Sequence, residues 1–274
     1  MTTTATSTPR PSGVLRIVPA ALLDARRPQR LIERSFVVYA SAWWIFVSGF
    51  FEPLFYLLSM DVGLSSLVGT VEDGGQTYDY AEFVAPALMA VAAMNGAIFD
   101  STIAIFFKLR NDVYDSILAT PLSSADIAVG EIGWAVIRGA FYSVSFLIVM
   151  VVLGLAGSPW LVMAVPACAL LGIAFASVGM ALTTYMRSWA DFDYIMAITV
   201  PLMVFSATFY PVSSYGDWAW IVNFSPLYHG VALTRAANAG VWEWSLLFNI
   251  AVLVALGLVG LRFTSRRFAG LLLT

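Results

Sequence analysis

The sequence WLVMAVPACALLGIAFASVGMALTT, residues 160–184, contains no acidic or basic side chain. It is longer than the roughly 20 apolar residues that an α-helix needs to cross about 30 Å of hydrocarbon. We therefore expect an all-α, polytopic membrane protein with six transmembrane helices. The other apolar runs of this kind lie near residues 37–59, 82–107, 132–156, 195–210 and 246–263.

The composition favours lipid as the surroundings of the chain. Of the 274 residues, 60% are hydrophobic and 11% are charged, whereas soluble domains average roughly 45–50% and 25%. A water-soluble fold of this length could not bury so much apolar surface, but a helix surface that faces lipid needs no burial. We expect membrane lipids as partners and no nucleic acid.

The basic residues predict the orientation. Six arginines precede residue 36, and further basic residues follow the second, fourth and last apolar runs, whereas four acidic residues precede the second run. By the positive-inside rule, both termini are cytoplasmic, and the chain is a multi-pass protein of a bacterial inner (plasma) membrane. We divide it into a cytoplasmic tail with an amphipathic interface helix (1–36), a transmembrane domain (37–264) and a cytoplasmic C-terminal tail (265–274).

Two segments depart from simple membrane spans. Between Val14 and Ser35, apolar residues alternate with Arg and Asp at nearly helical spacing, which predicts a broken amphipathic helix on the membrane face. A solvated basic tail that only sets topology is the alternative. The fifth run is short, and the prolines and glycines of 211–244 exclude one straight helix there. This pattern predicts a re-entrant element before the last span.

The chain lacks the motifs that would carry chemistry of its own. Its one lysine, Lys108, stands in Phe-Phe-Lys-Leu and not in the GxxxxGK[ST] loop that holds nucleotide phosphates. The single histidine, His229, and the single cysteine, Cys168, cannot form a metal cluster by themselves. Asp191 and Asp193 form an acidic pair, but they stand in a predicted solvated loop. We expect no enzyme activity, catalytic residue, cofactor or metal on this chain.

The stretch KLRNDVYDSILATPLSSADIAVGE, residues 108–131, predicts two helix starts. Asp112 can cap a short helix, and Ser123 with Asp126 resembles a capping box for the next one. The short helix has an apolar face with acids beside it, which suits docking to a soluble partner, although it could also lie on lipid headgroups. The predicted contacts are Asp112, Tyr114, Asp115, Ile117, Leu118, Thr120 and Pro121.

Polar residues inside the spans are candidates for function, because an isolated charge there costs about 2.5–3.5 kcal/mol. Asp100 and Arg138 can form an intramembrane pair, which would be structural, or Asp100 can contact a substrate. The segment 205–211 mixes aromatic rings with hydroxyls and either lines an exit path or packs the re-entrant element. The candidate substrate path comprises Asn95, Phe99, Asp100, Phe205, Ser206, Thr208, Phe209 and Tyr210.

Several motifs together resemble the permeases of type-2 ABC exporters. They are FVAPALMA (83–90), YDSILATPL (114–122), MALTTYMRSWADFD (180–193), FSATFYP (205–211) and SPLYHG (225–230). The chain looks most similar to the nodulation-type lipo-oligosaccharide exporter permeases, with the daunorubicin-type drug exporter permeases as more distant relatives. Members of this family often carry Glu where this chain has Asp100.

This resemblance implies a half-transporter whose coupling helix, Asp112 to Pro121, meets a cytoplasmic ATPase. Two permeases, either two copies or two paralogues, would assemble with two ATPase subunits that hold ATP and Mg. The implied function is outward transport of an amphipathic or lipid-linked substrate, such as a glycolipid, a lipo-oligosaccharide or a hydrophobic drug. The competing hypothesis is a stand-alone multi-span protein, either a secondary transporter or an intramembrane enzyme.

Overall fold

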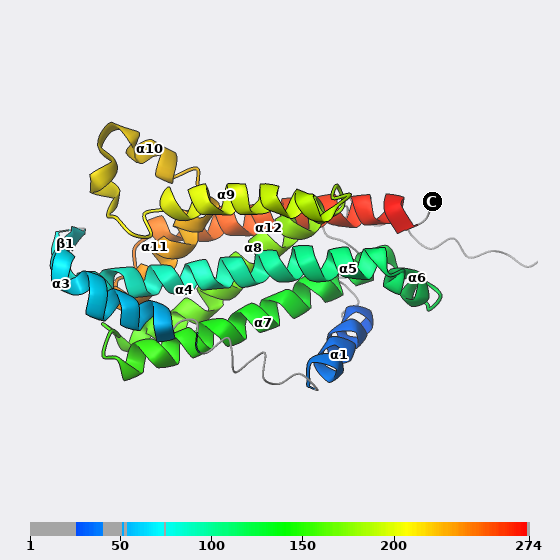
Figure 1. Ribbon diagram of the computed structural model, residues 1–274, viewed down its shortest axis with the longest axis horizontal. Helices are drawn as coiled ribbons and strands as arrows, with labels where there is room; N and C mark the ends of the chain where they lie inside the picture. The colour runs from blue at the N-terminus through cyan, green and yellow to red at the C-terminus, as the bar shows by residue number, and fades with distance from the viewer. Residues whose placement is uncertain (1–25, 41–50, 52–53, 74, 273–274) are drawn as a thin grey trace, which may run out of the picture.

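The computed structural model describes residues 26–40, 51, 54–73 and 75–272. Its long helices run side by side along one axis (Figure 1). Within these described residues, four helices are long and apolar enough to cross a membrane, and each matches a predicted span, which confirms the all-α membrane class. They are Tyr80–Arg110, Ser124–Val152, Pro159–Thr183 and Ser245–Arg267.

The remaining two predicted spans stay predictions. The first, 37–59, lies mainly outside the described residues, because 41–50 and 52–53 are not described. The fifth corresponds to α9, Phe192–Val204, whose 13 residues extend about 20 Å. That length alone does not cross a bilayer.

A local sequence signal explains where one long helix begins, and the span before that helix is interrupted by a π-helical turn. Helix α7, Ser124–Val152, begins with the predicted capping box, in which Asp126 N donates to Ser123 Oγ at 3.2 Å and Ser123 N donates to Asp126 Oδ2 at 2.8 Å. The preceding span consists of three consecutive segments. These are α4 (Tyr80–Phe99), the π-helical turn η4 (Asp100–Ala104) and α5 (Ile105–Arg110).

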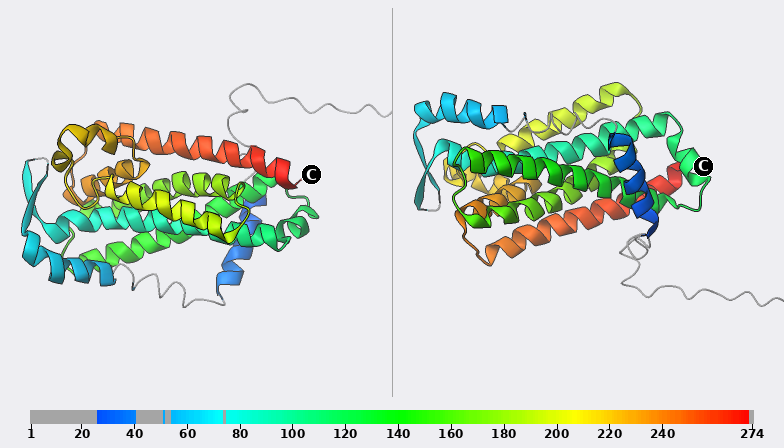
Figure 2. Two further views of the ribbon diagram at one scale, coloured as in Figure 1. Left: turned by 45° about the horizontal axis from the view of Figure 1, so that its top comes forward. Right: turned by 90° about the horizontal axis from the view of Figure 1, so that it is seen from below.

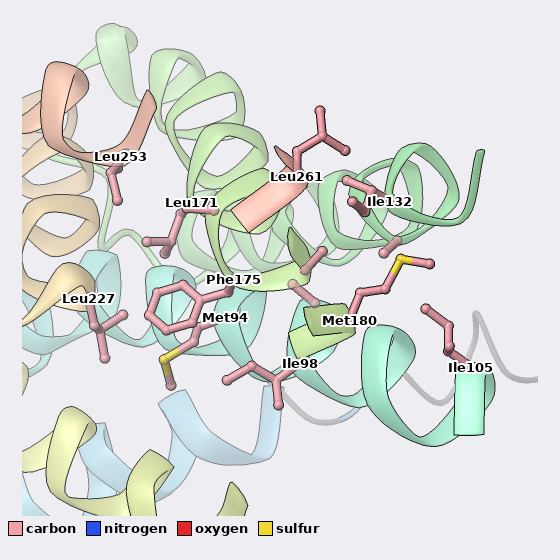
Figure 3. Close-up of a cluster of buried hydrophobic side chains, with 14 of the residues drawn as sticks. Met94, Ile98, Ile105, Ile132, Leu171, Phe175, Met180, Leu227, Leu253 and Leu261 are labelled. Atoms are coloured by element: carbon pink, nitrogen blue, oxygen red, sulfur yellow. The ribbon is translucent and has the colours of Figure 1, made fainter. Parts of the chain in front are cut away.

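Helix α8, Ala164–Thr183, lies at the centre of the bundle and packs against α4, α7, α11 and α12. Small residues allow this close approach: a Cβ on Gly260 of α12 would lie 2.8 Å from Ser177 Cβ. Hydroxyls also link neighbouring helices, since Thr183 Oγ1 donates to Ser101 O and Thr264 Oγ1 donates to Ser177 O, both at 3.0 Å. The aliphatic and aromatic side chains around α8 form a continuous core (Figure 3).

Short elements fill the end of the bundle that carries a β-hairpin (Figure 1). Helix α11, Pro226–Ala239, is buried along one face and packs against α4, α8 and α12. The helix α12, Ser245–Leu272, begins at the same end and continues without a break through most of the predicted C-terminal tail. The other elements here are η5 (Pro159–Met163), η7 (Val212–Trp218), α10 (Ala219–Val222), η3 (Met60–Leu64) and α3 (Ser65–Val68).

The hairpin is an addition to the predicted all-helical fold. Strands β1, Thr70–Asp73, and β2, Gln76–Asp79, pair antiparallel, with Thr70 opposite Asp79. Gly74 and Gly75 separate the two strands in the sequence. A Gly-Gly pair between short alternating segments is a hairpin signal, so the sequence contained the information for this element.

Helix α1, Arg26–Ala40, crosses the bundle obliquely at the end opposite the hairpin (Figure 2). Its residues 26–35 belong to the predicted amphipathic segment, whereas residues 14–25 of that segment lie outside the described residues. One face packs on α7, with Leu31 buried beside Gly130, while Phe36 and Val37 on the other side are exposed. The packing of one face of α1 and the exposure of apolar residues on the other agree with an amphipathic helix at a membrane surface.

Gly130→Ala is expected to push α1 away from α7. An added Cβ would lie 2.8 Å from Leu31 Cβ and 3.2 Å from Pro28 O, and overpacking of this kind costs about 1–3 kcal/mol. The measurement is the thermal unfolding midpoint in detergent. Gly139→Ala on the same helix is the matched control, because no atom in the described part of the chain lies within 4 Å of its added Cβ. Equal midpoints for the two variants would contradict the close α1–α7 packing.

Candidate functional site

Helix α6, Val113–Leu118, lies at the end of the bundle opposite the hairpin (Figure 1). Asp112 precedes it with a left-handed backbone, φ +52°, and its side chain makes no capping hydrogen bond. The predicted cap by Asp112 is therefore wrong. The chain must turn sharply after α5, and Asp is among the few residues that adopt the left-handed conformation at small cost.

The apolar face of α6 points inward. Tyr114 is 1% exposed and belongs, with Ile117, to the main core cluster, while Leu118 is partly buried against that cluster. The prediction that this face is free to anchor a soluble partner is wrong, because the bundle itself supplies the apolar surface that covers it. The exposed edge of the segment comprises Asp112, Asp115, Ser116, Ala119, Thr120 and Pro121.

The buried side chain of Tyr114 places α6 beside the carboxylate of Glu131. The pKa of Tyr114 is raised well above its usual value, first by burial and then by the negative charge of Glu131. Lys108 Nζ donates hydrogen bonds to both carboxylate oxygens of Glu131, at 2.6 and 2.7 Å. The three residues come from α6, α7 and α5, so one carboxylate joins three elements.

The Lys108–Glu131 pair is not among the contacts predicted from the sequence. Glu131 has 6% of its side chain exposed and Lys108 has 24%. The sequence does place a base, Lys108, in the last turn of one span and an acid, Glu131, in the first turns of the next, which is a signal for this pair. Consecutive antiparallel helices bring such ends together.

Asp100 and Arg138 lie deeper in the bundle, with Arg138 Nη1 2.7 Å from Asp100 Oδ1. Arg138 Nε donates to the Tyr142 hydroxyl at 3.0 Å, and Nη1 donates to that of Tyr39 at 3.4 Å. The guanidinium also lies over both tyrosine rings, with Arg138 Cζ 5.4 Å from the centroid of the Tyr39 ring and 5.5 Å from that of the Tyr142 ring. Arg138 therefore joins α7 to α1 and to the π-helical turn η4.

The π-helical turn begins at Asp100 itself, and such turns are frequent at functional sites. Asp100 Oδ2 is buried and, among the described residues, has no hydrogen-bond partner. A buried carboxylate oxygen without a donor is costly. Asp100 thus combines a structural ion pair with a free acceptor position.

The two groups of candidate path residues lie at different levels of the bundle. Asn95, Phe99 and Asp100 occupy the second half of the first described span. The segment 205–210 instead meets the beginning of that span, because Arg235 contacts both Thr208 O and Phe83 O. Asn95 is 12 residues from Phe83, or about 18 Å along the helix. Ser206 and Thr208 are buried, whereas Phe205 and Tyr210 are exposed.

A cavity of ≈ 330 Å³ lies beside this segment at the hairpin end. Arg235 of α11 lines it, with its Cζ 3.8 Å from the centroid of the Phe83 ring and its Nη2 3.2 Å from Thr208 O. Carboxylates from the hairpin, α4 and the loop before α12 line the same cavity. They belong to Asp73, Glu82 and Glu243. Arg235 is not among the site residues predicted from the sequence.

The remaining chemically notable residues have structural partners. His229 is buried between Asn249 Oδ1, at 2.7 Å from Nδ1, and Asn223 O, at 3.1 Å from Nε2. Cys168 is buried in the second core cluster. Asp191 caps the turn that begins at Ser188. Among the described residues, no group of three His, Cys, Asp or Glu side chains could hold a metal ion.

These features define a multi-pass α-helical membrane protein whose buried ion pairs join its helices. Residues 29–238 match the family model described as ABC-2 type transporter. The match covers more than half of the chain, and the chain belongs to this family. It is therefore a membrane permease subunit of an ABC transporter, a family that implies association with an ABC ATPase subunit.

Curated relatives agree with this placement. The chain is 31% identical to Nodulation protein J of Rhizobium leguminosarum bv. viciae over 74% of this chain and 78% of the relative. It is 32% identical to Nodulation protein J of Rhizobium leguminosarum bv. trifolii over 69% and 72%. It is 31% identical to Nodulation protein J of Sinorhizobium fredii over 68% and 71%.

Proposed function

We propose that this chain is the permease of an ABC exporter that moves an amphipathic or lipid-linked substrate outward across a bacterial inner membrane. Two permeases, as two copies or two paralogues, assemble with two ATPase subunits that hold ATP and Mg. The observation that carries the proposal is α6, a short helix fixed to the bundle by Tyr114 and Glu131 with an exposed edge that carries Asp112 and Asp115.

The charge distribution supports a cytoplasmic position for α6. Arg110, Arg187 and the basic end of α12 lie at the same end of the bundle as α6 (Figures 1 and 2). The opposite end carries the acidic hairpin and exposed tryptophans, which are typical of a membrane surface. In this topology the described helices belong to a six-span protein, and α10 with α11 forms the re-entrant element before α12.

The coupling path runs through buried polar contacts. The ATPase contacts the exposed edge of α6, and Tyr114 transmits a displacement of α6 to Glu131 and thereby to Lys108 on α5. Asp100 lies on the same span as Lys108, and Arg138 lies on α7 with Glu131. The second ion pair therefore joins the same two spans. ATP binding then shifts the permease between inward-open and outward-open states, because the ATPase binds these states with different affinity.

The proposed exit end of the bundle supports the proposed substrate class. The segment 205–210 offers exposed rings beside buried hydroxyls, and the cavity at Arg235 adds charged and amide groups. Such a path suits an amphiphile, whose apolar part meets the rings and whose polar part meets the cavity. A glycolipid, a lipo-oligosaccharide or a hydrophobic drug fits this description.

Site-specific crosslinking tests the docking of the ATPase. Cys168 is buried, so Asp115→Cys on the exposed edge of α6 supplies an accessible thiol. We expect a crosslinker with a maleimide at one end and a photoreactive group at the other to join Asp115→Cys to the co-expressed ATPase subunit. Gln76→Cys on the exposed hairpin is the control at the opposite end. Crosslinking from Gln76→Cys but not from Asp115→Cys would refute the proposed docking edge.

A further inference from the structure

A second hollow lies where α5 ends and the loop after α8 passes over it, at the end of the bundle opposite the hairpin. Its volume is ≈ 440 Å³, within the range of ligand pockets. The side chains that matter here come from two separate parts of the chain. They are Phe106, Phe107 and Arg110 on α5, and Arg187, Ser188 and Trp189 on the loop.

Among the residues that the structure describes, two guanidinium groups and no carboxylate line this hollow. In the described part of the chain, neither Arg110 nor Arg187 has a carboxylate within 4.0 Å, whereas Lys108 and Arg138 each have one. Arg110 instead lies over the Phe106 ring, with Cζ 5.3 Å from the centroid. Like charges that share one pocket repel each other, and an anion between them would remove that cost.

The nearest acid on the loop is already engaged. Asp191 Oδ2 accepts hydrogen bonds from Arg187 N at 2.6 Å and Ser188 N at 2.9 Å. These two bonds are the main reason that the pKa of Asp191 is lowered from its usual value, with the Arg187 charge as the smallest contribution. Asp191 therefore fixes the loop that carries Arg187 and Trp189 and does not occupy the hollow.

Aromatic rings place the hollow at the edge of the membrane. Trp189 lies 4.8 Å from Phe107 and 5.5 Å from Phe106, measured between ring centroids. Trp189 is 54% exposed, and Phe107 is also exposed. The hollow is at the end of the span Tyr80–Arg110, where lipid headgroups lie and where tryptophan is enriched. The arginines can thus contact the headgroup of a lipid, and the exposed rings can contact the acyl chains of the same lipid.

We propose that this hollow binds the phosphate of an anionic phospholipid headgroup, with Arg110 and Arg187 as the ligands. Basic pockets between spans bind anionic headgroups in this way. The bound lipid neutralises both arginines and links α5 to the loop before α9. The proposal is separate from the ATPase docking, so either can fail without the other.

The test uses the purified full chain in nanodiscs that contain a minor share of phosphatidylglycerol in phosphatidylcholine. After mild re-extraction, native mass spectrometry measures the lipid that remains bound. We expect phosphatidylglycerol to be retained above its bulk share, and Arg110→Gln/Arg187→Gln to reduce that enrichment roughly thirtyfold, as expected for two basic contacts. Arg110→Lys/Arg187→Lys should retain part of the enrichment, because it keeps both charges.

The matched control is Arg30→Gln/Arg266→Gln, which removes two exposed charges at the same end of the bundle but outside the hollow. This control should retain phosphatidylglycerol as the unmodified chain does. An equal loss in the control, or no enrichment in the unmodified chain, would overturn the proposal. Retention of inorganic phosphate by the unmodified chain without any enrichment of phosphatidylglycerol would also overturn it, because the hollow would then bind free phosphate and not a lipid.

Discussion

Arg138→Gln is expected to lower the free energy of unfolding by about 3–5 kcal/mol, because it leaves a buried carboxylate without its cation. Asp100 Oδ1 loses the contact at 2.7 Å, and Oδ2 already has no partner among the described residues. The hydrogen bonds to Tyr39 and Tyr142 are lost as well. Chemical denaturation in mixed micelles, followed by circular dichroism, measures the change.

The double variant Asp100→Asn/Arg138→Gln is the control for this prediction. Replacing both partners removes the buried charge as well as the pair, so the double variant should recover much of the stability that the single variant loses. Additive losses from the two single substitutions would show that the pair contributes little. Asp100 and Arg138 would then be independent of each other in the folded chain.

Glu131→Gln is expected to reduce transport by about tenfold, on the order of the coupling energies carried by contacts of this kind. The substitution removes the carboxylate that receives Lys108 Nζ at 2.6 and 2.7 Å and interacts with Tyr114. Lys108 on α5 and Glu131 on α7 are then no longer paired, and Tyr114 on α6 loses the carboxylate beside it. The measurement is substrate export from cells that express the complex, together with the ATPase turnover of the purified complex.

Lys108→Met/Glu131→Met separates coupling from stability. Apolar side chains of similar length can replace a buried ion pair without loss of stability, so this double variant should fold normally. It should still transport poorly, because Tyr114 keeps its burial but loses the charged group that joins it to the long helices. Normal export by either variant would contradict the coupling path through Glu131.

The features that the sequence predicted well depend on local patterns. The four long helices follow from runs of apolar residues that a bilayer requires. The start of α7 follows from Ser123 and Asp126, which are three residues apart and therefore close enough to cap each other. Cys168 is buried, as a lone cysteine inside an apolar run should be.

The features that the sequence did not reveal depend on which side of an element meets the rest of the fold. The spacing of Tyr114, Ile117 and Leu118 shows that they share a face, but not that this face turns toward α7. The contact of Lys108 with Glu131 requires knowledge of how two helix ends align.

Contacts between residues that lie far apart in the sequence are a second group of features that could not be predicted from the sequence. Arg235 reaches Phe83 across more than half of the chain, and no periodicity of either segment encodes such a contact. Asp100 and Arg138 were considered as a pair because unpaired charges are costly in lipid. The additional contact of Arg138 with Tyr39 depends on where α1 crosses the bundle.

The most direct test of the central claim is purification of the tagged chain from its native cells in mild detergent, followed by mass spectrometry of the co-purifying proteins and an ATPase assay. As a permease driven by separate ATPase subunits, the chain should co-purify with a stoichiometric nucleotide-binding protein, and the complex should hydrolyse ATP. A chain that is repeatedly isolated alone, with no response to nucleotide, would contradict the proposed exporter and favour a stand-alone membrane protein.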